Sequence, residues 1–145
     1  MLKGALYATV DLARALSRVP GGPRDLEVDF LAVSSYGNAD RSSGEVGLLK
    51  DTSDSIAGKT VLLIEDIVDG GLTLQYLQSL LNGRGPANLR TCVLFDKPYA
   101  RRAGVSIEYI GLQAPDAFVV GYGLDYQERY RNLPYLARVP AAVGK

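Results

Sequence analysis

The chain has 145 residues, of which 47% are hydrophobic and 22% charged, the composition of one globular domain with a buried core. Its 16 Lys and Arg residues balance 16 Asp and Glu, so we expect no binding to nucleic acid or to an anionic membrane. The absence of histidine and the single cysteine, Cys92, exclude a zinc site and a Cys–His nucleophile. We find no signal peptide and no apolar run that could cross a bilayer, and expect a cytoplasmic protein.

The first third of the chain predicts a helix, a strand and a polar loop. Residues 5–16 carry apolar side chains at helical spacing, and the Pro-Gly-Gly-Pro run at residues 20–23 ends this helix. Residues 26–34 have the apolar composition of a strand. The stretch of about 34–44 is polar and glycine-rich, which predicts a mobile loop, and residues 45–50 predict the returning arm of a hairpin.

The stretch from Val61 to Leu74 predicts a strand, an acidic turn and the start of a helix. Four apolar residues, 61–64, are typical of a strand buried in a parallel sheet. The polar and small residues that follow are Glu65, Asp66, Asp69, Gly70, Gly71 and Thr73. Apolar residues at spacings of three and four then predict a helix that ends near residue 83. A glycine turn before a helix is typical of a phosphate-binding site, and the acids suit ribose hydroxyls or magnesium.

The last third of the chain predicts short strands. Residues 89–95, 109–112, 118–121 and 136–139 have the composition of strands, and residues 124–130 predict a short turn or helix. Strands that alternate with helices indicate an α/β fold with a central parallel sheet flanked by helices. We therefore expect residues 1–145 to form a single domain.

The stretch from Val61 to Leu74 resembles the phosphoribosyl-pyrophosphate (PRPP) signature of the type I phosphoribosyltransferases. That signature is an apolar strand, two acids, two apolar residues, Asp-Thr-Gly, any residue, and Thr. The sequence matches it except at Gly70, where the family usually has threonine. On this stretch alone, the alternative is an acidic turn in another doubly wound protein.

Three further segments resemble the hypoxanthine-guanine phosphoribosyltransferases in particular. Leu2-Lys3-Gly4 is similar to their pyrophosphate loop, and Ser35-Tyr36 lies where they have a mobile lid. Residues 118–135, FVVGYGLDYQERYRNLPY, match their C-terminal signature almost throughout. The resemblance implies the type I phosphoribosyltransferase fold, with a partial hood from the C-terminal base-binding region of about 97–145.

The resemblance also implies a role for each matching residue. The residues implied to bind PRPP and its phosphates are Lys3, Gly4, Glu65, Asp66, Gly70, Gly71, Leu72, Thr73 and Arg131. The implied magnesium ligands are Glu65, Asp66 and Asp125, the purine-binding residues are Lys97, Phe118 and Val119, and Ser35 and Tyr36 belong to the lid. Asp69 is the implied general base. Lys97 donates hydrogen bonds and cannot accept them, which favours a 6-oxopurine over adenine. Arg101 or Arg102 is a further candidate for pyrophosphate, with surface charge as the alternative.

The implied reaction is magnesium-dependent transfer of the 5-phosphoribosyl group from PRPP to hypoxanthine or guanine. Its products are IMP or GMP and pyrophosphate, in purine salvage. The alternative is a non-catalytic or impaired regulator of the same fold that binds PRPP or nucleotide. The resemblance also implies a homodimer or homotetramer.

One further expectation concerns the start of the chain. In the family an apolar strand at the middle of the sheet precedes the Leu-Lys-Gly loop, but here only Met1 and Leu2 precede Lys3. A missing strand leaves backbone hydrogen-bonding groups unpaired. We therefore expect the protein to extend upstream, or a partner segment to fill the gap.

Overall fold

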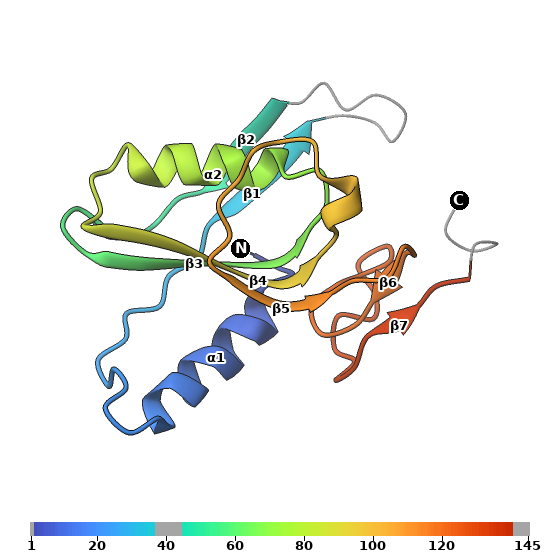
Figure 1. Ribbon diagram of the computed structural model, residues 1–145, viewed down its shortest axis with the longest axis horizontal. Helices are drawn as coiled ribbons and strands as arrows, with labels where there is room; N and C mark the ends of the chain where they lie inside the picture. The colour runs from blue at the N-terminus through green and yellow to red at the C-terminus, as the bar shows by residue number, and fades with distance from the viewer. Residues whose placement is uncertain (1, 37–44, 141–145) are drawn as a thin grey trace.

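The computed structural model describes residues 2–36 and 45–140 (Figure 1). Its elements in chain order are α1 (Leu6–Arg18), β1 (Ala32–Tyr36), β2 (Glu45–Lys50), β3 (Thr60–Val68), α2 (Leu72–Asn82), β4 (Asn88–Asp96), the 3-10 helix η1 (Pro98–Ala100), β5 (Tyr109–Gln113), β6 (Val119–Val120) and β7 (Ala137–Arg138). This order confirms the α/β class predicted from the sequence.

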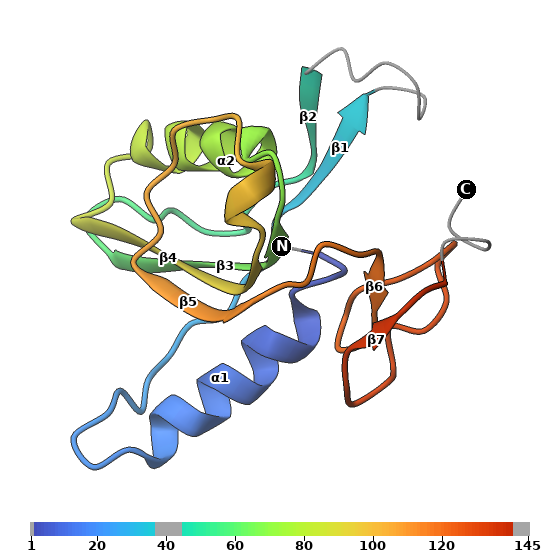
Figure 2. The same cartoon turned by 45° about the vertical axis from the view of Figure 1, so that its right-hand side comes forward.

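A three-stranded parallel sheet with the order β3-β4-β5 forms the centre of the molecule. Helix α2 covers one face of this sheet, and α1 lies on its other side (Figures 1 and 2). Two antiparallel pairs, β1–β2 and β6–β7, complete the structure. Because the central strands are parallel, their carboxyl ends lie at one edge of the sheet, where α/β proteins bind ligands.

The core lies between α2 and the sheet. Helix α2 buries Leu74, Leu77 and Leu81, and Leu77 has no exposed surface, whereas Leu72 at the start of the helix is 45% exposed. The buried residues of this core are Leu31, Leu63, Val68, Leu74, Leu77, Leu81 and Val93. A second cluster joins the C-terminal segment to β4, and it consists of Phe95, Ala114, Val119 and Leu124. The second cluster therefore packs the C-terminal segment against the sheet.

The bounds of two predicted elements are wrong. Residues 26–30 form no strand, and β1 begins only at Ala32. Among the described residues this segment has no ladder partner, and Val28 is 52% exposed, whereas a strand requires a neighbour for its backbone groups. The predicted loop of about 34–44 begins too early, because residues 34–36 pair with residues 45–47 in the β1–β2 hairpin. Residues 37–44 lie outside the described part of the chain.

Other elements follow the prediction with small differences. The central strand continues to Val68, so the two acids at positions 65 and 66 lie within it and not after it. Residues 124–130 form turns with an isolated bridge between Tyr126 and Arg129, and not a helix. The 3-10 helix η1 was not predicted. Within residues 2–36 and 45–140, no helix has the length and apolar character needed to cross a membrane.

Candidate active site

The turn between β3 and α2 presents backbone amides at the carboxyl end of the sheet. Gly71 precedes α2 with a φ of 90°, a conformation that residues with a side chain rarely adopt. No side chain caps this helix, and the Gln75 N–H donates to the Gly71 carbonyl at 2.9 Å. The N–H groups of the first turn of a helix have no partner within the helix, so this turn suits an anion such as phosphate.

The segment after β4 supports this turn. The backbone N–H groups of residues 102–103 donate to the Gly70 carbonyl at 2.9 and 3.0 Å. The Arg101 guanidinium donates to the Asp69 carbonyl at 3.3 Å and forms an ion pair with the Asp96 carboxylate. Arg101 therefore anchors the turn after β3. Its side chain is 20% exposed, and a contact of Arg101 or Arg102 with pyrophosphate stays a prediction.

Glu65 and Asp66, the acid pair, lie near the carboxyl end of β3. Glu65 is only 3% exposed, and burial raises its pKa to about 7. Burial also raises the pKa of Asp66. Within the described residues, the buried Oε1 atom of Glu65 has no hydrogen-bond partner. Such an oxygen is unfavourable unless a donor or a cation meets it, so the acid pair fits ribose hydroxyls or magnesium.

Three segments that are far apart in the sequence meet at Gly4. A Cβ atom at Gly4 would overlap the Asp66 carboxylate, and a Cβ atom at Gly123 would overlap the Gly4 carbonyl. Gly123 also has a φ of 101°. Only glycine fits at either position. This arrangement, the Gly4 contact, joins the predicted pyrophosphate loop, the acid pair and the C-terminal signature.

A network of charged side chains lies beside the Gly4 contact. Lys3 Nζ is 2.6 Å from Glu128 Oε2, and Arg131 Nη2 is 3.0 Å from Glu128 Oε1. The same Arg131 nitrogen is 2.7 Å from Asp125 Oδ1, and Arg131 Nη1 donates to the Gly123 carbonyl at 2.8 Å. The structure thus brings Lys3, Asp125 and Arg131 together, and Glu128 links them.

Lys97 and Asp69 form a second charged pair beside the turn. Lys97 Nζ lies 3.8 Å from Asp69 Oδ2, and the two side chains are 16% and 64% exposed. The Lys97 N–H donates to the Val68 carbonyl at 3.0 Å, which holds the lysine backbone against the end of β3. The exposed Asp69 carboxylate is therefore open to a ligand and has a cation next to it.

The other predicted purine-binding residues lie on β6 or directly before it. Val119 is buried and pairs with Arg138 of β7. The Phe118 carbonyl accepts a hydrogen bond from the Val139 N–H at 2.9 Å. The Phe118 ring is 48% exposed and packs edge-on against Tyr126, with ring centroids 5.8 Å apart. The β6–β7 pair thus holds Phe118 while about half of its surface stays accessible.

Comparison with known proteins identifies the family of this chain. Residues 1–127 match the family model described as a phosphoribosyl transferase domain. The chain belongs to this family.

Similar proteins refine that assignment. The hypoxanthine-guanine phosphoribosyltransferase of Bacillus subtilis is 48% identical over 143 residues, which cover 99% of this chain and 76% of that protein. The enzyme of the same name from Mycobacterium avium is 49% identical, with coverage of 99% and 68%. A crystal structure of the hypoxanthine phosphoribosyltransferase of Staphylococcus aureus has a TM-score of 0.89 at 42% identity, with coverage of 99% and 75%. The chain is thus a phosphoribosyltransferase of the hypoxanthine-guanine group.

The predicted lid of this phosphoribosyltransferase is described only in part, and the predicted set of magnesium ligands does not form one group in the described structure. Ser35 and Tyr36 lie in the last part of β1, and the rest of the predicted lid lies outside the described residues. In residues 2–36 and 45–140, no group of three or more His, Cys, Asp or Glu side chains could by itself hold a metal ion. Asp125 therefore does not complete a three-carboxylate group with the acid pair.

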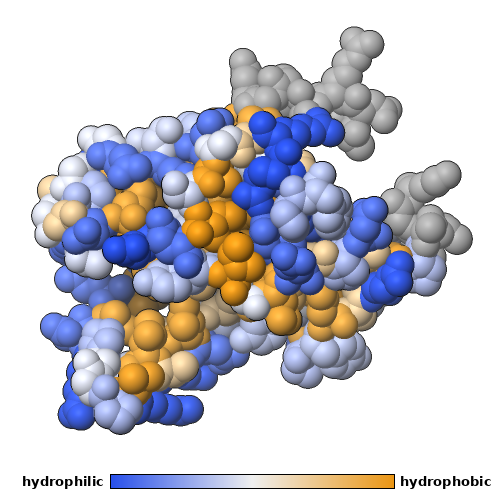
Figure 3. All heavy atoms as spheres, viewed as in Figure 1, coloured by the Kyte–Doolittle hydropathy of each residue, from blue (hydrophilic) through white to orange (hydrophobic). Residues whose placement is uncertain are grey.

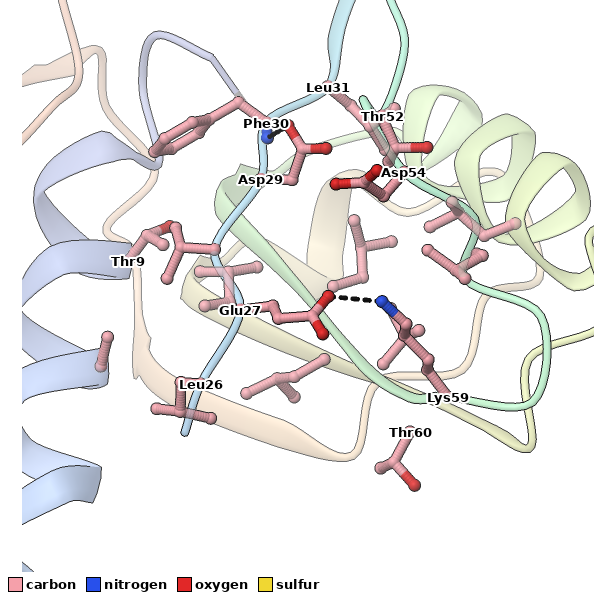
Figure 4. Close-up of a pocket in the computed structure, with 18 of the residues that line it drawn as sticks. Thr9, Leu26, Glu27, Asp29, Phe30, Leu31, Thr52, Asp54, Lys59 and Thr60 are labelled. Atoms are coloured by element: carbon pink, nitrogen blue, oxygen red, sulfur yellow. Dashed lines mark hydrogen bonds and ion pairs between the residues drawn. The ribbon is translucent and has the colours of Figure 1, made fainter. Parts of the chain in front are cut away.

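A cavity of about 690 Å³ lies away from the phosphoribosyltransferase site, along the free edge of β3 (Figure 4). It lies between α1, residues 25–31 and β3, and an ion pair of 2.5 Å joins Glu27 and Lys59 across it. None of the described residues predicted for the site lines it. The residues predicted for the site thus lie outside this cavity. That an upstream or partner segment supplies the strand missing before Lys3 stays a prediction.

Three contacts at or near the phosphoribosyltransferase site were not predicted from the sequence. Arg101 anchors the turn, Glu128 pairs with Lys3, and the Tyr122 hydroxyl donates to Asp11 Oδ2 at 2.6 Å. The pair of Lys3 and Glu128 spans 125 positions. Local spacing carries no signal for such a contact, although Glu128 and Tyr122 both lie within the matched C-terminal signature.

Proposed function

We propose that this chain catalyses magnesium-dependent transfer of the 5-phosphoribosyl group from PRPP to hypoxanthine or guanine. The products are IMP or GMP and pyrophosphate, in purine salvage. The Gly4 contact carries the proposal, because it joins three separate segments of the family resemblance into one site. The names of the relatives from Bacillus subtilis and Staphylococcus aureus support these purine substrates.

The donor would be held by groups on both sides of the Gly4 contact. The backbone of residues 70–73 and the Thr73 hydroxyl would bind the 5′-phosphate at the start of α2. The acid pair would accept hydrogen bonds from the ribose hydroxyls. The Gly4 backbone, Lys3 and Arg131 would bind pyrophosphate, for which a guanidinium offers two parallel donors.

The transfer forms a bond between a purine ring nitrogen and the reacting ribose carbon, while the bond from that carbon to pyrophosphate breaks. The proton of the ring nitrogen passes to the Asp69 carboxylate, a step that typically contributes about 10²–10⁴-fold to rate. Lys97 would donate to the purine 6-oxygen, where adenine has an amino group that cannot accept. Phe118 would stack on the purine, and the Val119 backbone would meet its edge.

The residues at the site fit magnesium, because the acid pair holds a buried carboxylate oxygen with no partner among the described residues. Glu65 and Asp66 would contribute oxygen ligands as a pair, and Asp125 would contribute one separately from them, since magnesium prefers oxygen ligands. The described residues form no three-carboxylate group, so the remaining oxygen ligands would come from PRPP. When bound, magnesium offsets the charge that develops on the departing pyrophosphate.

Two parts of the proposal concern the rest of the molecule. The loop that begins at Ser35 and Tyr36 would close over the site and exclude water that could hydrolyse PRPP. The region of about 97–145 would form a hood over the base within the single domain. We also propose a homodimer or homotetramer, for which light scattering is the test.

The test of the proposed function is product formation from PRPP and magnesium with hypoxanthine, guanine, xanthine and adenine in turn. We expect IMP and GMP, and no AMP. AMP formation would overturn the role of Lys97. PRPP binding without any product would support the impaired or regulatory alternative, which Gly70 favours because the family usually has threonine there.

A further inference from the structure

The carboxylate of Glu128 lies between the two cations that the proposed function assigns to pyrophosphate. Its Oε2 atom is 2.6 Å from Lys3 Nζ, and its Oε1 atom is 3.0 Å from Arg131 Nη2. Each oxygen of this carboxylate therefore has a cation within hydrogen-bond distance. An anion of this chain therefore already contacts both cations of the pyrophosphate site.

The backbone holds Glu128 in this position. The Glu128 N–H donates to Asp125 Oδ2 at 2.8 Å, and Tyr126 and Arg129 exchange backbone hydrogen bonds of 3.1 and 3.0 Å. Gln127 and Glu128 have φ values of 51° and 63°, which residues with a side chain adopt only uncommonly. A tight turn that is hydrogen-bonded on both sides thus directs the Glu128 carboxylate toward Lys3.

We propose that Glu128 is an internal competitor of pyrophosphate, a carboxylate that occupies Lys3 and Arg131 until a diphosphate group displaces it. In this role Glu128 is a positioning residue. It keeps the two cations oriented when pyrophosphate is absent. It also lowers the affinity of the site for pyrophosphate, so that this product dissociates more readily. The inference rests on the proposed function, because it takes this cation pair to be the pyrophosphate site.

The exposure of the pair limits the size of the effect. The Lys3 and Glu128 side chains are 65% and 64% exposed, so water and salt screen their attraction. Removing the carboxylate should therefore tighten pyrophosphate binding only about two- to tenfold. The gain should shrink as the salt concentration rises, because screening already weakens the competition.

The test is calorimetric titration of inorganic pyrophosphate with magnesium into the full chain and its variants. Glu128→Gln keeps the size of the side chain and removes its charge, and Glu128→Ala removes the group. Glu27→Gln is the matched control, since Glu27 is also exposed and pairs with a lysine, Lys59, at 2.5 Å, but lies at the cavity along the free edge of β3. Thermal unfolding without ligand shows that each variant is folded.

We expect both Glu128 variants to bind pyrophosphate about two- to tenfold more tightly, with Glu27→Gln unchanged. Equal or weaker binding by the Glu128 variants would overturn the inference, as would an equal gain in Glu27→Gln. If the unaltered chain binds pyrophosphate and forms nucleotide, such a result leaves the proposed function intact. If it neither binds pyrophosphate nor forms nucleotide, the proposed function fails and this inference fails with it.

Discussion

The carboxyl end and the free edge of β3 are built in contrasting ways. At the carboxyl end, the Gly4 contact is so close that only glycine fits, and the backbone of residues 102–103 hydrogen-bonds to the next turn. Along the free edge, the described residues give β3 no second ladder partner, and a cavity of about 690 Å³ separates it from α1. Figure 3 shows the molecule hollowed between α1 and the sheet, with apolar atoms along the hollow.

This difference separates two kinds of structural requirement. The end of a strand can be organised by turns and glycines that approach closely, whereas the edge of a strand depends on another strand for its hydrogen bonds. We therefore expect substitutions at the carboxyl end to alter binding and turnover, and substitutions along the free edge to have little effect on this chain.

The largest effect is expected for Asp69→Asn, which keeps the shape of the side chain and removes the proposed base. Turnover should fall by about 10²–10⁴-fold while PRPP still binds. Steady-state kinetics and PRPP titration measure the two quantities. Asp54→Asn, at the cavity, is the control and should leave both unchanged. Loss of PRPP binding with normal turnover of the remaining complex would make Asp69 a ligand-holding residue.

Lys97→Ala should have the next largest effect, because it removes a charged donor from the proposed purine site. The values of kcat/KM for hypoxanthine and guanine should fall about ten- to a hundredfold. Lys59→Ala removes a lysine from the cavity side of the molecule and is the control. Unchanged kinetics for both purines would show that Lys97 acts only as the partner of Asp69.

Gly70→Thr should strengthen phosphate binding at the carboxyl end of β3. A Cβ atom at Gly70 meets no atom within 4 Å, and its φ is not positive, so threonine fits and can donate its hydroxyl to phosphate. PRPP binding should tighten about tenfold, with the preference among purines unchanged. Weaker binding would show that the turn requires a backbone conformation at Gly70 that threonine disfavours.

Gly71→Thr is the matched control for that substitution. Gly71 has a φ of 90°, and a Cβ atom there would lie 3.0 Å from Arg101 Cδ. Threonine at this position should cost about 1–3 kcal/mol of stability, measured by chemical denaturation. The contrast between the two neighbouring glycines would show that the turn requires the positive φ of a glycine at Gly71 and not at Gly70.

The smallest effect is expected along the free edge. Val28 lines the cavity and is 52% exposed, so Val28→Ser should change the free energy of unfolding by less than about 0.5 kcal/mol. Leu77→Ala, in the closed core under α2, should cost about 2–5 kcal/mol. A loss of about 1.5–3 kcal/mol for Val28→Ser would indicate a fully buried side chain and a filled cavity.

The sequence predicts the carboxyl end of β3 better than its edge for a physical reason. The strand, the glycine turn and α2 are consecutive, so apolar spacing and Gly71 predict them locally. Residues 26–30 look like a strand by composition, but their structure depends on a neighbour that composition does not reveal. The anchoring of the turn by Arg101 and the contact of Lys3 with Glu128 depend on tertiary folding, and no local pattern contains them.

The most direct test of the account is PRPP binding by Gly4→Ala, because the Gly4 contact joins the three segments that form the proposed site. Gly104→Ala is the matched control, since a Cβ atom there meets nothing within 4 Å. With both variants shown to be folded, we predict that Gly104→Ala binds PRPP like the unaltered chain and that Gly4→Ala binds it at least about tenfold more weakly. Equal binding of PRPP by Gly4→Ala and the unaltered chain would contradict the account.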